Sequence, residues 1–142
     1  MAAYETDEAR FDVPASWLDR SVTSLEYSSP EGVTRVVVQR EPTEQRTLKD
    51  LHTARLVDLR RRLAAFELIL EEEVLVAGRA AVELGMRYRD EDAHLYQHAV
   101  TLIVGEKLVT VGVLGPVKAG EHIDALFQRL RATITIRDAE DT

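Results

Sequence analysis

The stretch from residue 67 to residue 114 decides the fold, and it consists of ELILEEEVLV (67–76), AAVELGMRY (80–88), HLYQHAVTLIV (94–104) and KLVTVGVL (107–114). Within these segments the side-chain character changes with a period of two, which is the period of a β-strand. Gly78, the stretch 89–92 and Gly105-Glu106 separate the segments with residue types that favour tight turns. The pattern predicts four consecutive antiparallel strands, the last of them ended by Gly115-Pro116.

The segments before residue 67 predict three shorter strands and a helix. The predicted strands are residues 9–13, 21–27 and 33–40. Turn-forming residues over 28–32 join the last two strands into a hairpin, and Pro42 ends the sheet. Thr47 is the expected N-cap of a helix, in which leucines at helical spacing continue to about Phe66.

A second helix, predicted over residues 119–133, completes the order β-β-β-α-β-β-β-β-α. Because no β-α-β alternation occurs, the expected fold class is α+β, an antiparallel β-sheet with two main helices packed on it. A chain of 142 residues is long enough for one domain with a real core, and we expect a single domain over residues 1–142. The aromatic residues Trp17, Phe66 and Phe127 are expected in that core.

Composition and charge narrow the range of partners. Apolar residues make up 45% of the chain and charged residues 30%, as in ordinary globular proteins. The net charge of −7 argues against nucleic acid and anionic membrane surfaces as partners. Because there is no cysteine, disulfides, thiolate nucleophiles and Cys-based zinc sites are excluded. The acidic N-terminus lacks the apolar core of a signal peptide, so we expect a cytoplasmic protein without direct membrane insertion.

No motif indicates catalysis, a metal site or a cofactor. His94 and His98 share a strand face but lack a third ligand with suitable spacing. The alternation of a strand sends Glu72 to the face opposite Glu71 and Glu73, so this acidic run is not an acid/base pair. The serines lack a nucleophile elbow and the glycines lack the spacing of a phosphate loop. We therefore expect no enzyme, no metal and no cofactor.

Two glutamines interrupt apolar strands, Gln39 after three valines and Gln97 after Tyr96. One interpretation is that both are simply exposed on their strands. The other is that each amide lies in a half-buried apolar surface, where it can donate to and accept from the backbone of a bound partner. The second interpretation suits a protein that binds apolar helices.

Several motifs follow one another in order from residue 11 to about residue 136. They are Phe11-x-Val-Pro-x-x-Trp17-x-Asp19-x-Ser21-Val22, Val36-Val-Val-Gln-Arg40-Glu41, Leu56-x-x-Leu-x-x-x-Leu63-x-x-Phe66, Gly78-Arg-x-Ala, Tyr96-Gln97 and Phe127. Each motif alone is weak, but the ordered set is fairly specific. It resembles the DcrB-related family, and within it the Eag-type chaperones of type VI secretion system effectors.

The resemblance implies a Mog1/PsbP-like fold, a homodimer and a concave apolar groove without catalytic activity. In the family, this groove holds the N-terminal transmembrane helices of an effector that also carries a PAAR domain. The chaperone shields these helices in the cytoplasm and aids loading of the effector on the secretion spike. The alternative function is a non-catalytic Mog1/PsbP-like interaction module that binds a folded partner.

Carried over residue by residue, the resemblance implies ten client-binding groove positions. They are Val22, Ser24, Val36, Val38, Arg55, Leu59, Leu63, Ala93, Leu95 and Gln97. Ser24 stands where the family often has a branched apolar residue and Arg55 where glutamine is common, so both make the groove more polar. Whether the Val38 face or the Gln39 face of the third strand lines the groove is left open. Core packing is the alternative interpretation for all ten positions.

Overall fold

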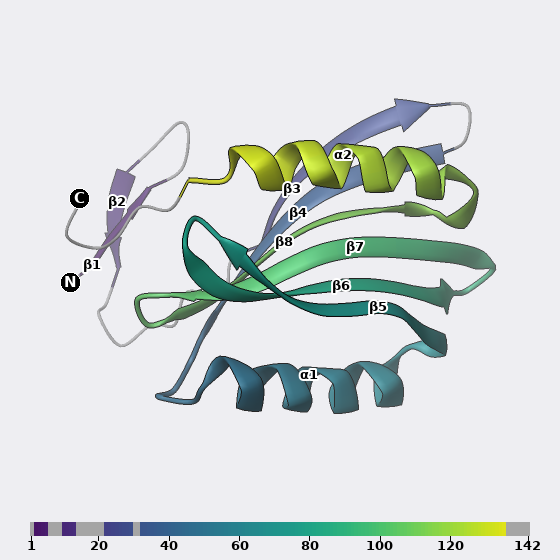
Figure 1. The fold of residues 1–142 in the computed structure, drawn as a ribbon. Helices are drawn as coiled ribbons and strands as arrows, with labels where there is room; N and C mark the ends of the chain where they lie inside the picture. The colour runs from purple at the N-terminus through teal and green to yellow at the C-terminus, as the bar shows by residue number, and fades with distance from the viewer. Residues whose placement is uncertain (1, 6–9, 14–21, 30–31, 136–142) are drawn as a thin grey trace.

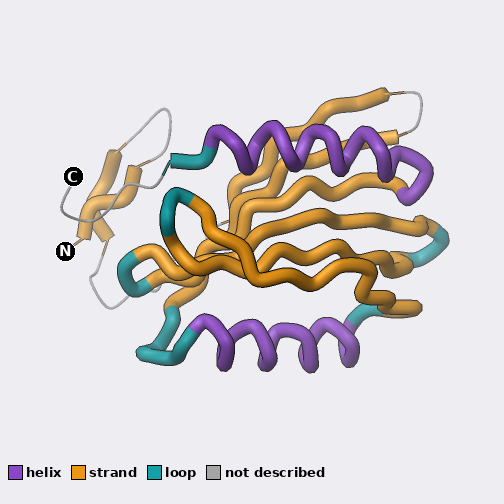
Figure 2. The backbone as a smooth tube through the Cα atoms, in the orientation of Figure 1, coloured by secondary structure: helices purple, strands orange, loops and turns teal. Residues whose placement is uncertain are grey.

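The computed structural model describes residues 2–5, 10–13, 22–29 and 32–135. Its elements are β1 (Ala2–Glu5), β2 (Arg10–Val13), β3 (Val22–Ser29), β4 (Gly32–Pro42), α1 (Leu48–Arg62), β5 (Ala64–Val76), β6 (Arg79–Asp90), β7 (Ala93–Val104), β8 (Lys107–Pro116), a short 3₁₀ turn (Val117–Ala119) and α2 (Gly120–Thr133). Six strands form one antiparallel sheet in the order β3-β4-β8-β7-β6-β5, and β1 pairs with β2. The two helices lie on opposite faces of the six-stranded sheet (Figures 1 and 2).

Strands β5 to β8 follow one another as antiparallel neighbours, so the four strands predicted from the period-two pattern are confirmed. The predicted turns are confirmed as well, because Gly78 and Gly105 have φ angles of 78° and 61°. This left-handed conformation costs glycine little and other residues more. The hairpin of β3 and β4 is also confirmed, and the structure adds β1, which the sequence did not predict.

Helix α2 covers one face of the sheet and forms the main core with it. Ile123 and Phe127 are buried one helical turn apart, as the apolar spacing of this helix predicts. They pack in one cluster with Val100 of β7 and Val113 of β8. The prediction that Phe127 is a core residue is confirmed. Trp17 and the polar tail after residue 137 lie outside the described residues.

Helix α1 begins as predicted. The Oγ1 atom of Thr47 accepts a hydrogen bond from the backbone N–H of Asp50 over 3.1 Å, which is the geometry of an N-cap. The connection from β4 contains a tight turn, in which the N–H of Arg46 donates to the carbonyl of Thr43 over 3.0 Å. Both central residues of this turn, Glu44 and Gln45, have positive φ angles of 53° and 64°. Such angles strain residues that carry a Cβ atom.

The predicted end of this helix was wrong. The helix stops at Arg62, and Leu63 is already extended with φ −96° and ψ 130°. The chain then enters β5, whose pairing with β6 begins at Ala64 opposite Arg89. Cross-strand pairing to a distant part of the chain outweighs the helical propensity of two alanines. Phe66 was therefore also placed wrongly, because it is half-buried at this bulged start of β5 and not in the core.

Candidate functional site

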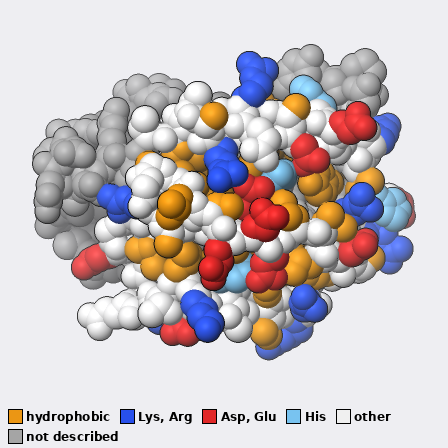
Figure 3. Space-filling view, viewed as in Figure 1, with side chains coloured by type: hydrophobic (Ala, Val, Ile, Leu, Met, Phe, Trp, Pro, Cys, Tyr) orange, Lys and Arg blue, Asp and Glu red, His pale blue; other side chains and the backbone are white. Residues whose placement is uncertain are grey.

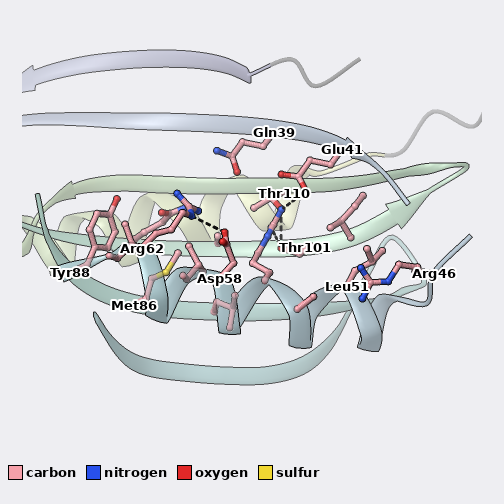
Figure 4. A pocket seen from close by; sticks show the side chains of 18 residues that line it. Gln39, Glu41, Arg46, Leu51, Asp58, Arg62, Met86, Tyr88, Thr101 and Thr110 are labelled. Carbon is pink, nitrogen blue, oxygen red and sulfur yellow. Dashed lines mark hydrogen bonds and ion pairs between the residues drawn. The ribbon is translucent and has the colours of Figure 1, made fainter. Parts of the chain in front are cut away.

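A cleft of about 440 Å³ separates α1 from the face of the sheet that α2 leaves uncovered. We call it the α1 cleft, and its lining residues are Gln39, Glu41, Arg46, Leu51, Ala54, Arg55, Asp58, Leu59, Arg62, Leu63, Leu84, Met86, Tyr88, Gln97, Ala99, Thr101, Leu108 and Thr110. Figure 4 shows Tyr88, Arg62 and Met86 at one end, Leu51 and Arg46 at the other, and Thr101 and Thr110 between them. A second hollow of about 340 Å³ shares four of these residues and continues the cleft to the strained turn before α1.

Strand register explains which side chains reach the cleft. Gln39 of β4 lies opposite Thr110 of β8, which lies opposite Thr101 of β7. One row further along the strands, Gly112 of β8 lies opposite Ala99 of β7. Because directly opposed residues of an antiparallel pair share a face, each row crosses the cleft floor as a line of neighbours. One row of the cleft floor therefore has polar side chains, and the next row has small residues.

Gly112 provides the low point of this floor. A Cβ atom at this position would lie 2.9 Å from the Cβ of Ala99 and 3.3 Å from Nε2 of Gln97. The first distance is shorter than real Cβ contacts, so any larger residue would force neighbouring atoms apart. The missing side chain allows the Gln97 amide to lie over the neighbouring strand.

Arg55 joins α1 to the polar row of the floor. One terminal nitrogen of its guanidinium donates to Oγ1 of Thr110 over 2.5 Å and approaches Oγ1 of Thr101 at 3.4 Å. The other terminal nitrogen lies 3.4 Å from a carboxylate oxygen of Glu41. The two threonine hydroxyls are themselves 3.0 Å apart. Arg55 is thus a partly buried cation held mainly by neutral hydroxyl groups.

The side-chain amides of Gln39 and Gln97 have no hydrogen-bond partner within residues 32–135. Both are half-buried and line the cleft. Each amide can donate two hydrogen bonds and accept two. Tyr88 adds a phenol at one end, where burial, and then the charge of Asp90, raises the pKa of the phenol above its ordinary value of 10.0. Tyr88 therefore enters the cleft as a neutral donor.

The structure brings together four of the ten residues predicted for the groove, namely Arg55, Leu59, Leu63 and Gln97, all of which line the α1 cleft. Leu95 lies opposite Tyr88, beyond the end of the cleft, with Ala93 exposed at the start of β7. Val22 lies opposite Gln39 in the β3–β4 register, and Ser24 lies opposite Val37.

Val36 and Val38 are not part of this surface. Val36 packs against the core cluster beneath α2, and Val38 lies opposite Val111, which packs against the same cluster. Strand alternation sends Gln39 and Glu41 toward α1 and the even-numbered valines toward α2, so the Gln39 face is the one that lines the α1 cleft. The prediction that Val36 and Val38 share one groove with Arg55 and Gln97 was therefore wrong, because the strand register places the two valines on the opposite face of the sheet.

A wider depression of about 1,000 Å³ lies beside the start of α1, where β5 and β6 contribute to its lining. Nε2 of His52 lies 3.0 Å from a carboxylate oxygen of Glu71 at its edge. Leu75 is 69% exposed there, at the edge strand of the sheet. Figure 3 shows acidic and basic side chains interspersed on this side of the molecule, with apolar groups between them. The α1 cleft is taken as the candidate site because it contains four of the residues predicted for the groove, and this depression contains none of them.

Sequence reasoning missed a buried ionic cluster on the other face of the sheet. His98 of β7 lies between two carboxylates, with Nε2 3.0 Å from Glu83 and Nδ1 2.8 Å from Asp124. Each ring nitrogen of His98 thus lies within hydrogen-bond distance of a carboxylate oxygen. The ring stacks on Phe127 at 3.9 Å, and Arg131 donates to Glu83 over 2.9 Å. The cluster ties β6, β7 and α2 together.

Tyr96 completes the cluster. Its hydroxyl donates to Asp124 over 2.6 Å. Burial, followed by this hydrogen bond and the charge of Asp124, raises the pKa of Tyr96 well above its ordinary value of 10.0. Within residues 32–135, no three His, Asp or Glu side chains have the arrangement needed to hold a metal ion. In the same part of the chain, neither helix has the length and apolar character to span a membrane.

Comparisons with solved structures agree on the fold. A Pseudomonas aeruginosa protein of unknown function, described as a putative regulator, is 20% identical with a TM-score of 0.86 over 98% of this chain and 99% of its own. LpqN of Mycobacterium tuberculosis, involved in cell envelope biogenesis, is 12% identical with a TM-score of 0.60 over 78% and 68%. PsbP of Synechocystis sp. PCC 6803 is 17% identical with a TM-score of 0.54 over 96% and 92%.

These likenesses confirm the predicted α+β class and its Mog1/PsbP-like form. No curated protein matches the sequence. The DcrB family model, however, matches residues 8–133, which cover the six-stranded sheet and both helices. The chain therefore belongs to the DcrB family.

Proposed function

We propose that this protein is a cytoplasmic chaperone that binds and shields the N-terminal transmembrane helices of a PAAR-containing type VI secretion effector and aids its loading on the secretion spike. The α1 cleft is the observation that carries the proposal. It contains apolar side chains that are only half-buried, such as Leu51 and Leu63, beside the amides of Gln39 and Gln97. An apolar helix presents a hydrophobic stripe along its length and free backbone carbonyls in its last turn, and side chains suited to both support the proposal.

The size of the cleft suggests how a client helix binds. A transmembrane helix of about 20 residues is about 30 Å long and about 10 Å wide, so its volume is about 2,400 Å³. The cleft of about 440 Å³ accommodates one stripe of side chains and not the whole helix. Shielding the rest requires a second surface, which supports the expectation of a homodimer whose two clefts hold the client between them.

Co-expression with the N-terminal fragment of the effector encoded beside this protein tests the proposal. We expect the fragment to be soluble with this protein and insoluble without it. Leu63→Gln places an amide among the apolar groups of the cleft and should abolish this effect. Val57→Gln is the matched control, because Val57 is also on α1 but is 54% exposed and outside the cleft lining. Equal solubility of the fragment with and without the protein would defeat the proposal.

The charged residues of the cleft favour one further candidate, an interaction module for a folded partner. Arg46, Arg62, Glu41 and Asp58 all line the cleft, and folded surfaces offer polar complements to such groups. The two candidates differ in which part of an effector they bind. Binding of the effector's folded domain after removal of its transmembrane region would support the module. Binding of the helical fragment alone would support the chaperone.

A further inference from the structure

The charge of the α1 cleft differs from that of the whole chain. The chain has 25 acidic and 18 basic residues, whereas the described cleft lining has three arginines and two carboxylates. Arg62 pairs with Asp58 at 2.7 Å within α1. Glu41 is left as the carboxylate nearest to Arg55, and its side chain is 52% exposed. The cleft is therefore a locally cationic region on an acidic protein.

The charge of Arg55 is only weakly compensated, although just 16% of its side chain is exposed. Two of its contacts are to the neutral hydroxyls of Thr101 and Thr110, and its distance to Glu41 is 3.4 Å. A half-exposed carboxylate at this distance is a weak counter-ion. A guanidinium has five N–H donors in a planar fork that matches a carboxylate, so donors remain for a bound anion.

Groups beside Arg55 strengthen the preference of the cleft for a bound anion. Gln39 lies opposite Thr110, so its amide is a cross-strand neighbour of the hydroxyl that holds Arg55. A carboxylate on Arg55 could receive a second hydrogen bond from this amide, which lacks a partner among residues 32–135. Leu51 lies beside Arg46 at one end of the cleft and the buried Met86 lies beside Arg62 at the other, so each end combines apolar and cationic side chains (Figure 4).

We propose that Arg55 selects client helices that carry one acidic side chain in the middle of an otherwise apolar stretch. This inference rests on the proposed chaperone function. The apolar residues before and after the acidic one pack against the half-buried Leu51 and Leu63, and the carboxylate replaces the weak counter-ion of Arg55. A carboxylate in a membrane helix is costly to expose to lipid and marks a helix that needs a partner.

Three synthetic peptides test the selection on the full chain. Each is a leucine–alanine helix of about 20 residues whose central residue is glutamate, glutamine or leucine. Binding is measured by fluorescence anisotropy at pH 7. We expect the protein to bind the glutamate peptide about tenfold more tightly than the glutamine peptide, since hydrogen bonds between ions exceed those between neutral groups.

Two variants assign the preference to one residue. Arg55→Gln should bind the glutamate and glutamine peptides equally, and it should remain folded because Thr101 and Thr110 still bond to each other. Arg61→Gln is the matched control, since Arg61 is exposed on the same helix and outside the cleft lining. It should keep the preference.

The outcomes separate this inference from the function on which it rests. Equal binding of the glutamate and glutamine peptides by the unaltered protein would overturn the selection and leave the chaperone proposal standing. A preference that survives in Arg55→Gln would also overturn the role of Arg55. Failure to bind any of the three peptides would overturn both. The comparison on the unaltered protein remains decisive even if Arg55→Gln unfolds.

Discussion

Replacing His98 with alanine should destabilise this protein by about 4 kcal/mol. The ring is 4% exposed and bridges Glu83, which is also 4% exposed, to Asp124. Removing one partner of a buried ion pair costs about 3–5 kcal/mol, and the lost stacking on Phe127 adds about 0.5–1.5 kcal/mol. Because Arg131 still compensates Glu83, we expect the lower part of the combined range.

Urea unfolding at pH 7, followed by circular dichroism, measures this loss. With a slope of about 2 kcal/mol per molar urea, the midpoint should fall by about 2 M. His94→Ala is the matched control, since His94 lies on the same strand but is exposed, and it should change stability by less than about 0.5 kcal/mol. In a double-mutant cycle with Glu83→Gln, the two losses should be strongly non-additive.

The cluster of Glu83, His98, Asp124 and Arg131 permits one further test. Replacing His98 and Glu83 together with leucine should recover much of the loss, because a well-packed apolar pair avoids the desolvation cost of the charges. A loss below about 1 kcal/mol for His98→Ala, or additive behaviour in the cycle, would refute the reasoning. Either result would mean that the ionic contacts contribute little beyond filling space.

Three smaller predictions use the same unfolding assay. Thr47→Ala should cost about 1 kcal/mol, because the N–H of Asp50 loses its cap; unchanged stability would mean that the cap does not hold α1. Glu44→Asn with Gln45→Gly should instead stabilise by about 1 kcal/mol by relieving two positive φ angles, and a loss would contradict strain in that turn. The raised pKa of Tyr96 makes the folded state retain a proton that the unfolded state loses above about pH 10, so the free energy of unfolding should fall as the pH rises past this value. The fall should be less steep in Tyr96→Phe. Parallel curves for the two proteins would contradict the contribution of Tyr96.

Elements governed by local periodicity could be predicted from the sequence. The bounds of strands β5 to β8 and helix α2 agree closely with their apolar periodicity. Each of these elements packs its apolar side chains against one neighbouring surface. The end of α1 could not be predicted, because the pairing of Ala64 with Arg89 brings together residues that the sequence keeps far apart. Local propensity favoured a longer helix, and long-range pairing decided against it.

The candidate site was partly predictable for a similar reason. Gln97 and Gln39 stood out because they interrupt apolar strands, and both line the cleft. The ionic cluster carried a comparable signal that was missed, namely the single charged residue Glu83 within a buried run of β6. Its partners His98 and Asp124 lie on other elements, so the sequence alone shows the unusual residue but not what compensates it.

The two helices differ in how far the fold buries their apolar side chains. Helix α2 places Ile123 and Phe127 deep in the core, and its half-buried Leu126 and Leu130 pack against the same cluster. In α1, by contrast, Leu59 is the only buried apolar residue, and Leu51 in the helix and Leu63 just past its end are half-buried along the cleft. Leucines at helical spacing predict burial in both helices, and in α1 this burial is incomplete. The proposed chaperone function would use this half-buried apolar surface on the α1 side to cover the apolar helices of a client.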